Sequence, residues 1–235
     1  MMQLVIENIK KSFGKKEVLK GISFTFDQGH IYGLLGRNGS GKTTLFSIIS
    51  DVLIKDGGRF FLLDGQKEME LEPADVFFMI AEPTLPSFLT GRELIEFYIE
   101  INEKRIKDLK TVDEYFDQIA FEKEDRDRLI QGYSTGMKNK LQMMMFMILR
   151  PPVILMDEPL TSLDVVVQLE IKKLIRSIRK DHIILFSTHI LQLAEDLCDK
   201  IVLLHEGKLH FMDDKLMEDE DFEEILIQQL SKKED

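Results

Sequence analysis

The chain has 235 residues, 44 % hydrophobic and 31 % charged, a composition ordinary for a soluble globular protein with an ample core. A formal net charge of −11 without a basic cluster excludes a typical nucleic-acid-binding protein, because phosphate neutralisation needs clustered Lys and Arg. The single cysteine, Cys198, excludes an internal disulfide and fits a reducing compartment, so the cytoplasm is the expected location.

The negative charge is concentrated at the C-terminal end. Residues 213–235 carry ten acidic and three basic side chains, a net charge of −7, and the other 212 residues carry −4. This stretch is expected to be an acidic helix or tail, docked through Phe222, Ile225 and Leu226, with partner binding as the alternative. No apolar run reaches the roughly 20 residues of a membrane helix, and no signal peptide is expected.

The first 80 residues are expected to combine antiparallel strands with one strand–loop–helix unit. Strands are predicted over 2–26, where Ile22, Phe24 and Phe26 alternate with polar residues at the period of a half-buried strand. The apolar run 31–35 precedes a glycine-rich loop, and a helix is predicted over 43–50. Short strands are expected over 59–63 and 76–80.

The loop from Gly36 to Thr44 has the spacing Gly-x4-Gly-Lys-Thr of a phosphate-binding P-loop. Gly36, Gly39 and Gly41 permit positive φ and leave no side chain to block a phosphate. Backbone amides would then converge on anionic oxygens, with Lys42 reaching the β and γ phosphates and Thr43 contacting Mg²⁺. A glycine-rich turn without a ligand is the alternative. The other expected binding positions of the loop are Asn38, Ser40 and Thr44.

A mostly helical insertion is expected over residues 83–150. Capping-box patterns at Thr90 and Thr111 each begin a helix. A third helix is predicted from Met137 to Arg150 and ends before Pro151-Pro152. We assign its methionines to the core, with an adaptable binding face as the alternative.

Alternation of strands and helices returns after residue 150. The apolar runs 153–156 and 183–186 lack polar alternation, which is typical of a parallel sheet covered on both faces. A helix is predicted between them, through Val167 to Ile178, and a closing hairpin over 201–211. The sequence therefore predicts an α/β fold. Its expected parts are a nucleotide-binding core with a β subdomain (1–82 and 151–212), a helical subdomain (83–150) and the acidic tail (213–235).

Polar residues follow two of the apolar strands, where ligands of open α/β sheets bind. Asp157 is expected to hold Mg²⁺, and Glu158, one residue on, to polarise an attacking water. A capping or solvated pair is the alternative reading. His189 follows the run 183–186, and a lone histidine at a strand end is more often structural than catalytic.

The order of these motifs resembles that of the ATP-binding cassette (ABC) ATPase family, over residues 2 to about 212. Tyr133-Ser134-Thr135-Gly136-Met137 occupies the place of the family's signature motif, Leu-Ser-Gly-Gly-Gln, of which the serine and the second glycine are retained. This form is similar to that of ATPases serving ABC-2 type exporters. Three further places match family motifs: Thr161 to Asp164 the D-loop, His189 the switch histidine, and Phe13 the aromatic ring stacked on adenine. For His189 the resemblance implies contact with the γ-phosphate in place of a purely structural role.

The resemblance implies a P-loop NTPase (RecA-like) core that binds ATP and Mg²⁺ and works as a head-to-tail dimer of two copies. Ser134 and Gly136 of one copy would meet the γ-phosphate bound by the other, a role compatible with Ser134 being a helix N-cap. Asp164 would belong to the same site. A separate transmembrane permease is implied, with this chain peripheral on the inner face of the cell membrane. Catalysis would rest on Glu158, His189 and Lys42.

One position departs from the family pattern. The glutamine that follows the strand 76–80 in the family corresponds to Ala81. Either Glu82 contacts Mg²⁺ in its place or coupling to the insertion is weaker; a plain loop residue before Pro83 is the third reading. The apolar stretch beside it either borders the groove for a coupling helix of the membrane subunit or packs the insertion onto the core. That stretch contains Leu85, Pro86, Phe88 and Leu89.

The sequence thus predicts the ATP-binding and ATP-hydrolysing subunit of an ABC transporter, of the ABC-2 exporter type. A soluble ABC ATPase without a membrane partner is one alternative, which two cassettes in one chain or a coiled-coil insertion would favour. A non-hydrolysing ATP-dependent regulator is another, motivated by Ala81 and the altered signature. The retained Lys42, Asp157, Glu158 and His189 favour hydrolysis.

Overall fold

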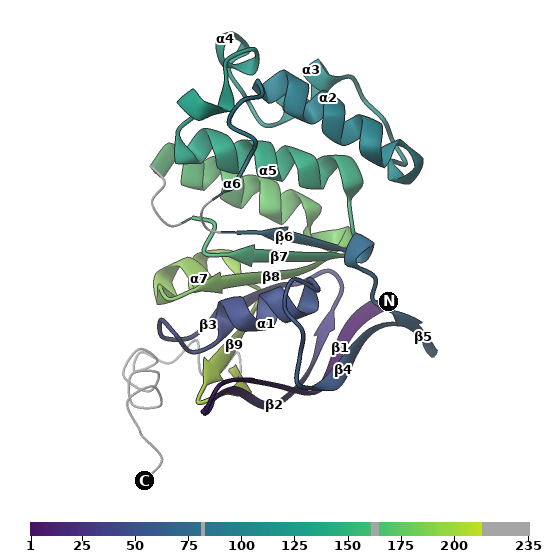
Figure 1. Ribbon diagram of the computed structural model, residues 1–235, viewed down its shortest axis with the longest axis vertical. Coiled ribbons are helices and arrows are strands. Elements are labelled where there is room, and N and C mark those ends of the chain that lie inside the picture. Colours follow the sequence, from purple (N-terminus) through teal and green to yellow (C-terminus); the bar gives the residue numbers. More distant parts are fainter. Residues whose placement is uncertain (81–82, 161–164, 213–235) are drawn as a thin grey trace. The chain divides into compact units, whose positions relative to one another are not determined.

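Two compact units make up the chain in a computed structural model that describes residues 1–80, 83–160 and 165–212 (Figure 1). The first unit contains Met1–Phe78, Pro152–Glu158 and the chain from Arg176 onward. The second contains Met79–Pro151 and Pro159–Ile175. Several predicted features lie outside the described residues: Ala81 and Glu82, the D-loop from Thr161 to Asp164, and the tail 213–235.

The antiparallel part of the first unit is a four-stranded sheet, sheet A, in the order β2-β1-β4-β5. The pairing of its long strands β1 and β2 is offset by register shifts beyond Ile6, which let β1 bend. The predicted alternation near Ile22 is present, since Ile22 and Phe26 are buried and Thr25 is exposed. The strands are β1 (Met2–Phe13), β2 (Lys16–Asp27), β4 (Gly57–Asp64) and β5 (Lys67–Glu70).

Sheet B has six strands in the order β10-β9-β3-β8-β7-β6, and the run β7-β8-β3-β9 is parallel. The predicted closing hairpin is confirmed, because β10 pairs antiparallel to β9. All residues of β3, β7 and β8 are buried, as expected for strands covered on both faces. The bounds are β3 (Ile31–Leu35), β6 (Val76–Met79), β7 (Val153–Asp157), β8 (Ile183–Thr188), β9 (Lys200–His205) and β10 (Lys208–Met212).

Helices α1 (Lys42–Ile49) and α7 (Leu191–Leu197) cover opposite faces of sheet B. Leu34 of β3 packs in the main apolar cluster with α1 and the inner face of sheet A, whereas the next residue, Leu35, packs with α7. Successive side chains of a strand point to opposite faces, so the two helices must lie on different sides. This arrangement fixes the edge at which the carboxyl ends of β3, β7 and β8 meet.

The second unit is helical and has its own apolar core. The two predicted capping boxes are confirmed: Thr90 Oγ1 accepts from Glu93 N at 3.1 Å, and Thr111 Oγ1 accepts from Glu114 N at 3.3 Å. Met144 is fully buried in this core, so the core assignment of the methionine stripe is confirmed. The helices are α2 (Gly91–Asn102), α3 (Val112–Gln118), α4 (Lys123–Arg126), α5 (Thr135–Leu149) and α6 (Val165–Ile178), which continues into the first unit.

Single turns of 3₁₀ helix connect these elements. They are η1 (Pro73–Asp75), η2 (Glu103–Arg105), η3 (Ile130–Gly132) and η4 (Arg179–Asp181). The sheets and helices together confirm the predicted α/β class, with an antiparallel β portion and a helical insertion.

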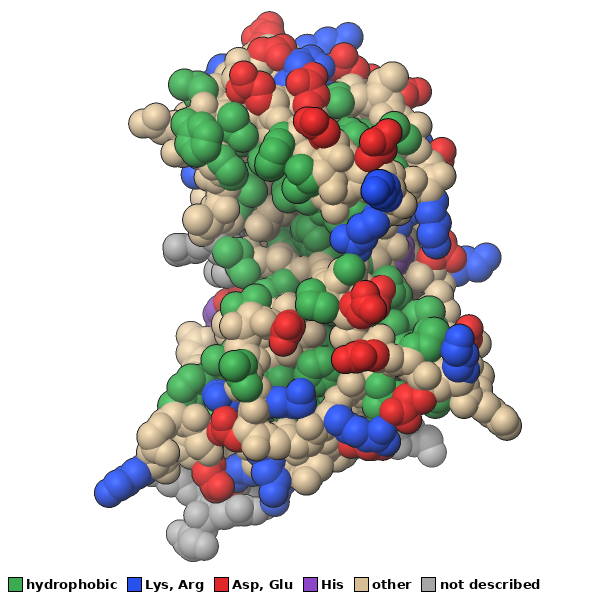
Figure 2. All heavy atoms as spheres, turned by 45° about the vertical axis from the view of Figure 1, so that its right-hand side comes forward, with side chains coloured by type: hydrophobic (Ala, Val, Ile, Leu, Met, Phe, Trp, Pro, Cys, Tyr) green, Lys and Arg blue, Asp and Glu red, His purple; other side chains and the backbone are tan. Residues whose placement is uncertain are grey.

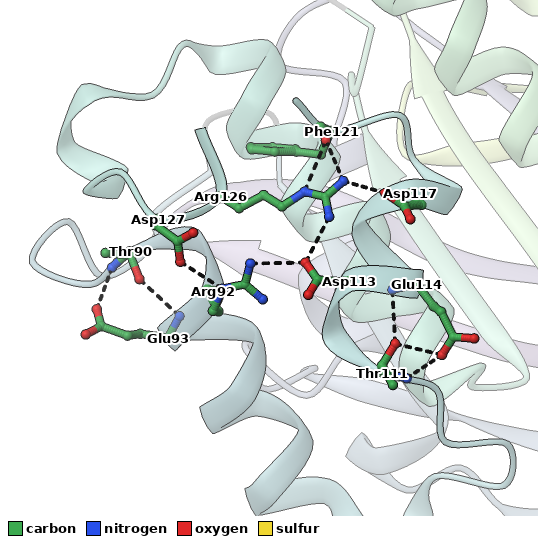
Figure 3. A network of polar contacts seen from close by, with 10 residues as sticks. All are labelled: Thr90, Arg92, Glu93, Thr111, Asp113, Glu114, Asp117, Phe121, Arg126 and Asp127. Carbon is green, nitrogen blue, oxygen red and sulfur yellow. Dashed lines mark hydrogen bonds and ion pairs between the residues drawn. The ribbon is translucent and has the colours of Figure 1, made fainter. Parts of the chain in front are cut away.

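A buried arginine joins the short helices of the second unit (Figure 3). Arg126 is 4 % exposed and donates to Asp113 at 2.9 Å and to Asp117 at 2.5 Å. Arg92 of α2 donates to the same Asp113 oxygen at 3.0 Å and to Asp127 at 2.7 Å. Because these residues come from α2, α3, α4 and the residue after α4, the network fixes the chain that leads into α5.

The surface carries mixed charge. On the face drawn in Figure 2, Lys and Arg side chains are scattered among Asp and Glu, and hydrophobic side chains reach the surface between them. Within the described ranges, none of the helices has both the length and the apolar character needed to cross a bilayer.

Candidate active site

The loop between β3 and α1 is closely packed around its first glycine. A Cβ atom on Gly36 would lie 2.6 Å from Ser40 Oγ and 2.7 Å from Leu204 O, so a larger residue does not fit. Gly41 has φ of 109° and is the N-cap of α1, without a side chain that could occupy the first amides of the helix. The loop and the helix end therefore offer backbone N–H groups to an anion.

Lys42 is held inside this loop. Its side chain is 6 % exposed, and Nζ donates to Gly36 O at 2.8 Å and to Arg37 O at 3.4 Å. Burial lowers the pKa of the Lys42 ammonium, and the charges of Glu158 and Asp157 act in the opposite direction. A cation removed from water in this way gains from an anionic partner such as a phosphate.

Thr43 and Asp157 meet although 114 residues separate them. Asp157 ends β7 and is 7 % exposed, and its Oδ2 accepts from Thr43 Oγ1 at 2.6 Å. A carboxylate beside a hydroxyl, both next to a phosphate-binding loop, is the oxygen donor set that Mg²⁺ takes at nucleotide sites.

Glu158 stands between Lys42 and His189. Its Oε1 is 3.8 Å from Lys42 Nζ, and both carboxylate oxygens are 3.0 Å from His189 Nδ1. Since a carboxylate only accepts, this contact places a proton on Nδ1. Glu158 also has φ of 49°, a left-handed conformation that is unusual for a side chain of this size. A non-glycine residue in that conformation often marks a functional position.

Ser187 belongs to this group but was not assigned from the sequence. It is fully buried in β8, directly beside Asp157 in the parallel pair β7–β8. Its hydroxyl donates to Asp157 Oδ1 at 2.5 Å. The signal that could have identified it is a hydroxyl residue at the end of a buried apolar strand, but the strand register that pairs it with Asp157 is not visible in the sequence.

The remaining predicted contacts of the first unit lie along the loop and the β1–β2 hairpin. Phe13 ends β1 and is 50 % exposed, as a stacking platform would be. Asn38 and Gly39 are exposed, and Thr44 is half-buried. Ser40 Oγ is buried without a hydrogen-bond partner. The structure thus places the loop residues, Asp157, Glu158 and His189 together.

Ser134 and Gly136 lie in the second unit, at the start of α5. Ser134 is the N-cap, and its Oγ accepts from Met137 N at 3.2 Å, as the sequence predicted. Ser134 is exposed, and both residues line a hollow of about 180 Å³. A helix end with an accessible serine is suited to an anion.

Comparison with known proteins gives a consistent result. A family model described as ABC transporter matches residues 19–161, more than half of the chain. An uncharacterized ABC transporter ATP-binding protein, YdbJ of Bacillus subtilis, is 32 % identical over 210 residues, 88 % of this chain and 67 % of the relative. The lantibiotic transport ATP-binding protein SrtF of Streptococcus pyogenes is 28 % identical over 210 residues, 88 % of each chain.

A solved structure is similar over nearly the whole chain. It is that of an ATP-binding subunit of an ABC transporter, with a TM-score of 0.79 and 22 % identity, covering 97 % of this chain and 99 % of its own. The predicted P-loop NTPase fold, with its β subdomain and helical insertion, is thereby confirmed.

Proposed function

Because the chain belongs to the ABC transporter family of ATP-binding, ATP-hydrolysing proteins, we propose that it powers an exporter of the ABC-2 type. The family carries the ATPase assignment. The exporter type rests on the Tyr-Ser-x-Gly-Met form of the signature at Tyr133–Met137, and the relative SrtF is named for lantibiotic transport.

The observation that carries a hydrolytic role is the cluster at one edge of sheet B. The Glu158 carboxylate lies 3.8 Å from Lys42 Nζ and 3.0 Å from His189 Nδ1. A γ-phosphate bound by the loop would have Lys42 to stabilise its charge, with Glu158 beside it to accept a proton from water. His189 holds the Glu158 carboxylate and offers a second polar group to the same phosphate.

Magnesium fits the residues present. Thr43 and Asp157 would hold the ion, which when bound offsets the negative charge of the transferred phosphate. Phe13 would stack on the adenine ring, and the loop amides would bind the phosphates. Glu82 stays a candidate for the metal site.

We further propose that two copies complete two sites head to tail. In one copy, Ser134 is exposed and Gly136 lies at the start of α5. These two residues would contact the phosphate that the loop of the other copy binds. Asp164 of the D-loop is proposed to join that interface.

A separate transmembrane permease is the proposed second partner, which would place this chain on the inner face of the cell membrane. Phe88, 77 % exposed, is available for such docking. Leu85 and Leu89 instead pack against the helical core. The packing of Leu85 and Leu89 supports the core reading for those two residues, and we propose docking for Phe88.

Glu158→Gln tests the proposed base. The change removes the proton acceptor and keeps its size, so phosphate release from ATP by the purified chain should fall roughly 10²–10⁴-fold. Binding of a fluorescent ATP analogue should persist, and size-exclusion chromatography should show an ATP-dependent dimer.

Glu206→Gln is the matched control. Glu206 has the same φ of 49° but lies in the β9–β10 turn, so the variant should hydrolyse ATP like the parent. Unchanged turnover in Glu158→Gln would remove Glu158 from the mechanism. Parent protein that binds ATP without hydrolysing it, alone and with its membrane partner, would favour the regulator instead.

A further inference from the structure

The side chain of Ser187 has no contact with solvent and faces the carboxylate of Asp157. The parallel pairing of β7 and β8 sets Asp157 opposite Ser187, at the end of the strands that reaches the site. A hydroxyl buried there must hydrogen-bond, because leaving a buried polar group unpaired is unfavourable.

The two oxygens of Asp157 each accept from a different hydroxyl. Oδ1 accepts from Ser187 at 2.5 Å and Oδ2 accepts from Thr43 at 2.6 Å. Two donors on opposite oxygens fix the rotation of the carboxylate about its last bond. Thr43 Oγ1 is itself expected to bind the metal, so Ser187 is the donor to Asp157 that is not a metal ligand.

Ser187 also holds the residue after Asp157. The amide of Glu158 donates to Ser187 O at 3.2 Å and lies 3.1 Å from Ser187 Oγ as a second acceptor. This bond is made where the backbone of Glu158 takes its left-handed conformation. A sparsely populated backbone conformation persists only where surrounding contacts determine it.

We infer that Ser187 is a positioning residue, which sets the affinity for the magnesium ion of the ATP site by orienting Asp157. The inference rests on the proposed function. Ser187 itself touches neither nucleotide nor metal in this arrangement and acts through Asp157. Residues that hydrogen-bond a metal ligand in this way change metal affinity or activity by about 10–100-fold when they are removed.

The test measures metal dependence without turnover. Every variant is made in the full-length Glu158→Gln chain, and binding of a fluorescent ATP analogue is titrated with Mg²⁺. Ser187→Ala should raise the Mg²⁺ midpoint about 10–100-fold. Binding in EDTA, which reports the loop and Phe13 alone, should stay as in the parent.

Two further variants separate positioning from folding. Ser187→Cys keeps a donor in a slightly larger side chain, and the thiol is a weaker donor, so its midpoint should shift in the same direction and by less. Thr188→Val removes the neighbouring buried hydroxyl, which accepts from Ile190 N at 3.0 Å, and should leave the midpoint unchanged. Thermal unfolding of each variant shows that it is folded.

The inference is overturned if Ser187→Ala and Ser187→Cys, both folded, give the parent's Mg²⁺ midpoint, or if Thr188→Val shifts it equally. Failure of the proposed function would look different. In that case the parent itself would show no Mg²⁺-dependent binding of ATP.

Discussion

A Cβ atom at position 36 would come within 2.7 Å of a backbone oxygen, Leu204 O, which cannot move aside as a flexible side chain could. Gly36→Ala should therefore displace the phosphate loop, at a cost of about 1–3 kcal/mol to the closely packed form. We expect ATP-analogue binding to weaken by roughly 5–150-fold, the equivalent of that free energy. Equilibrium binding at fixed Mg²⁺ measures it.

Gly57→Ala is the control for this prediction. Its added Cβ would meet only Lys10 side-chain atoms at 3.9 Å, ordinary contact, and its φ is not in the left-handed range. Equal binding losses in the two variants would mean that the loss at Gly36 comes from general destabilisation.

Among single residues, the sequence predicted those that belong to a short local pattern. Lys42 and Thr43 follow from the loop pattern, and Asp157 from the strand before it. Ser187 could not be found in the same way, because its role depends on the register of β7 against β8. The contact between Glu158 and His189 likewise needs the strand order, since 31 residues separate them.

Among the elements, the network around Arg126 holds the short helices of the second unit (Figure 3). Arg126→Met keeps much of the buried stem and removes the donors to Asp113, Asp117 and the carbonyl oxygen of Phe121. Both carboxylates are more than half exposed and remain hydrated, so the loss is that of hydrogen bonds to charged groups, roughly 1–3 kcal/mol. Urea unfolding followed by circular dichroism would measure it.

Arg128→Met provides the comparison, because Arg128 is two residues away and 53 % exposed, with an ion pair to Asp125 and a hydrogen bond to Gly132 O. Surface pairs of this kind contribute little, so its effect should stay within about 0.5 kcal/mol. Equal stability of the two variants would show that the buried network is not what holds these helices.

The elements that the sequence predicted, such as β3, β7 and α2, are long apolar runs or begin with a helix-capping pattern. The elements that it did not predict are short and depend on their surroundings. β5 (Lys67–Glu70) is a charged run that becomes a strand by pairing with β4. α7 (Leu191–Leu197) has seven residues, and it packs closely on β3 because Gly33 leaves room for Cys198 Sγ.

For the whole molecule, a net charge of −11 opposes the association of two copies. Salt shortens the range of that repulsion, from about 30 Å at 0.01 M to about 10 Å at 0.1 M. The ATP-bound dimer proposed for Glu158→Gln should therefore become more abundant as salt rises over this range. Light scattering after size-exclusion chromatography measures the dimer fraction.

The charge of residues 213–235 allows a direct check. A chain ending at Met212 carries −4 in place of −11, so its dimer fraction should depend less on salt. A dimer that dissociates as salt rises would instead indicate attraction between charged groups of opposite sign across the interface.

The left-handed backbone at Glu158 has a practical consequence for building a nucleotide sensor from this chain. An ATP-capturing reagent needs a residue here that cannot act as the proposed base and does not strain the main chain. Asparagine enters the left-handed region far more readily than glutamine, so Glu158→Asn would silence the chemistry and relax the backbone with a single replacement. The positive φ of Glu158 thus favours asparagine over the isosteric glutamine for such a reagent.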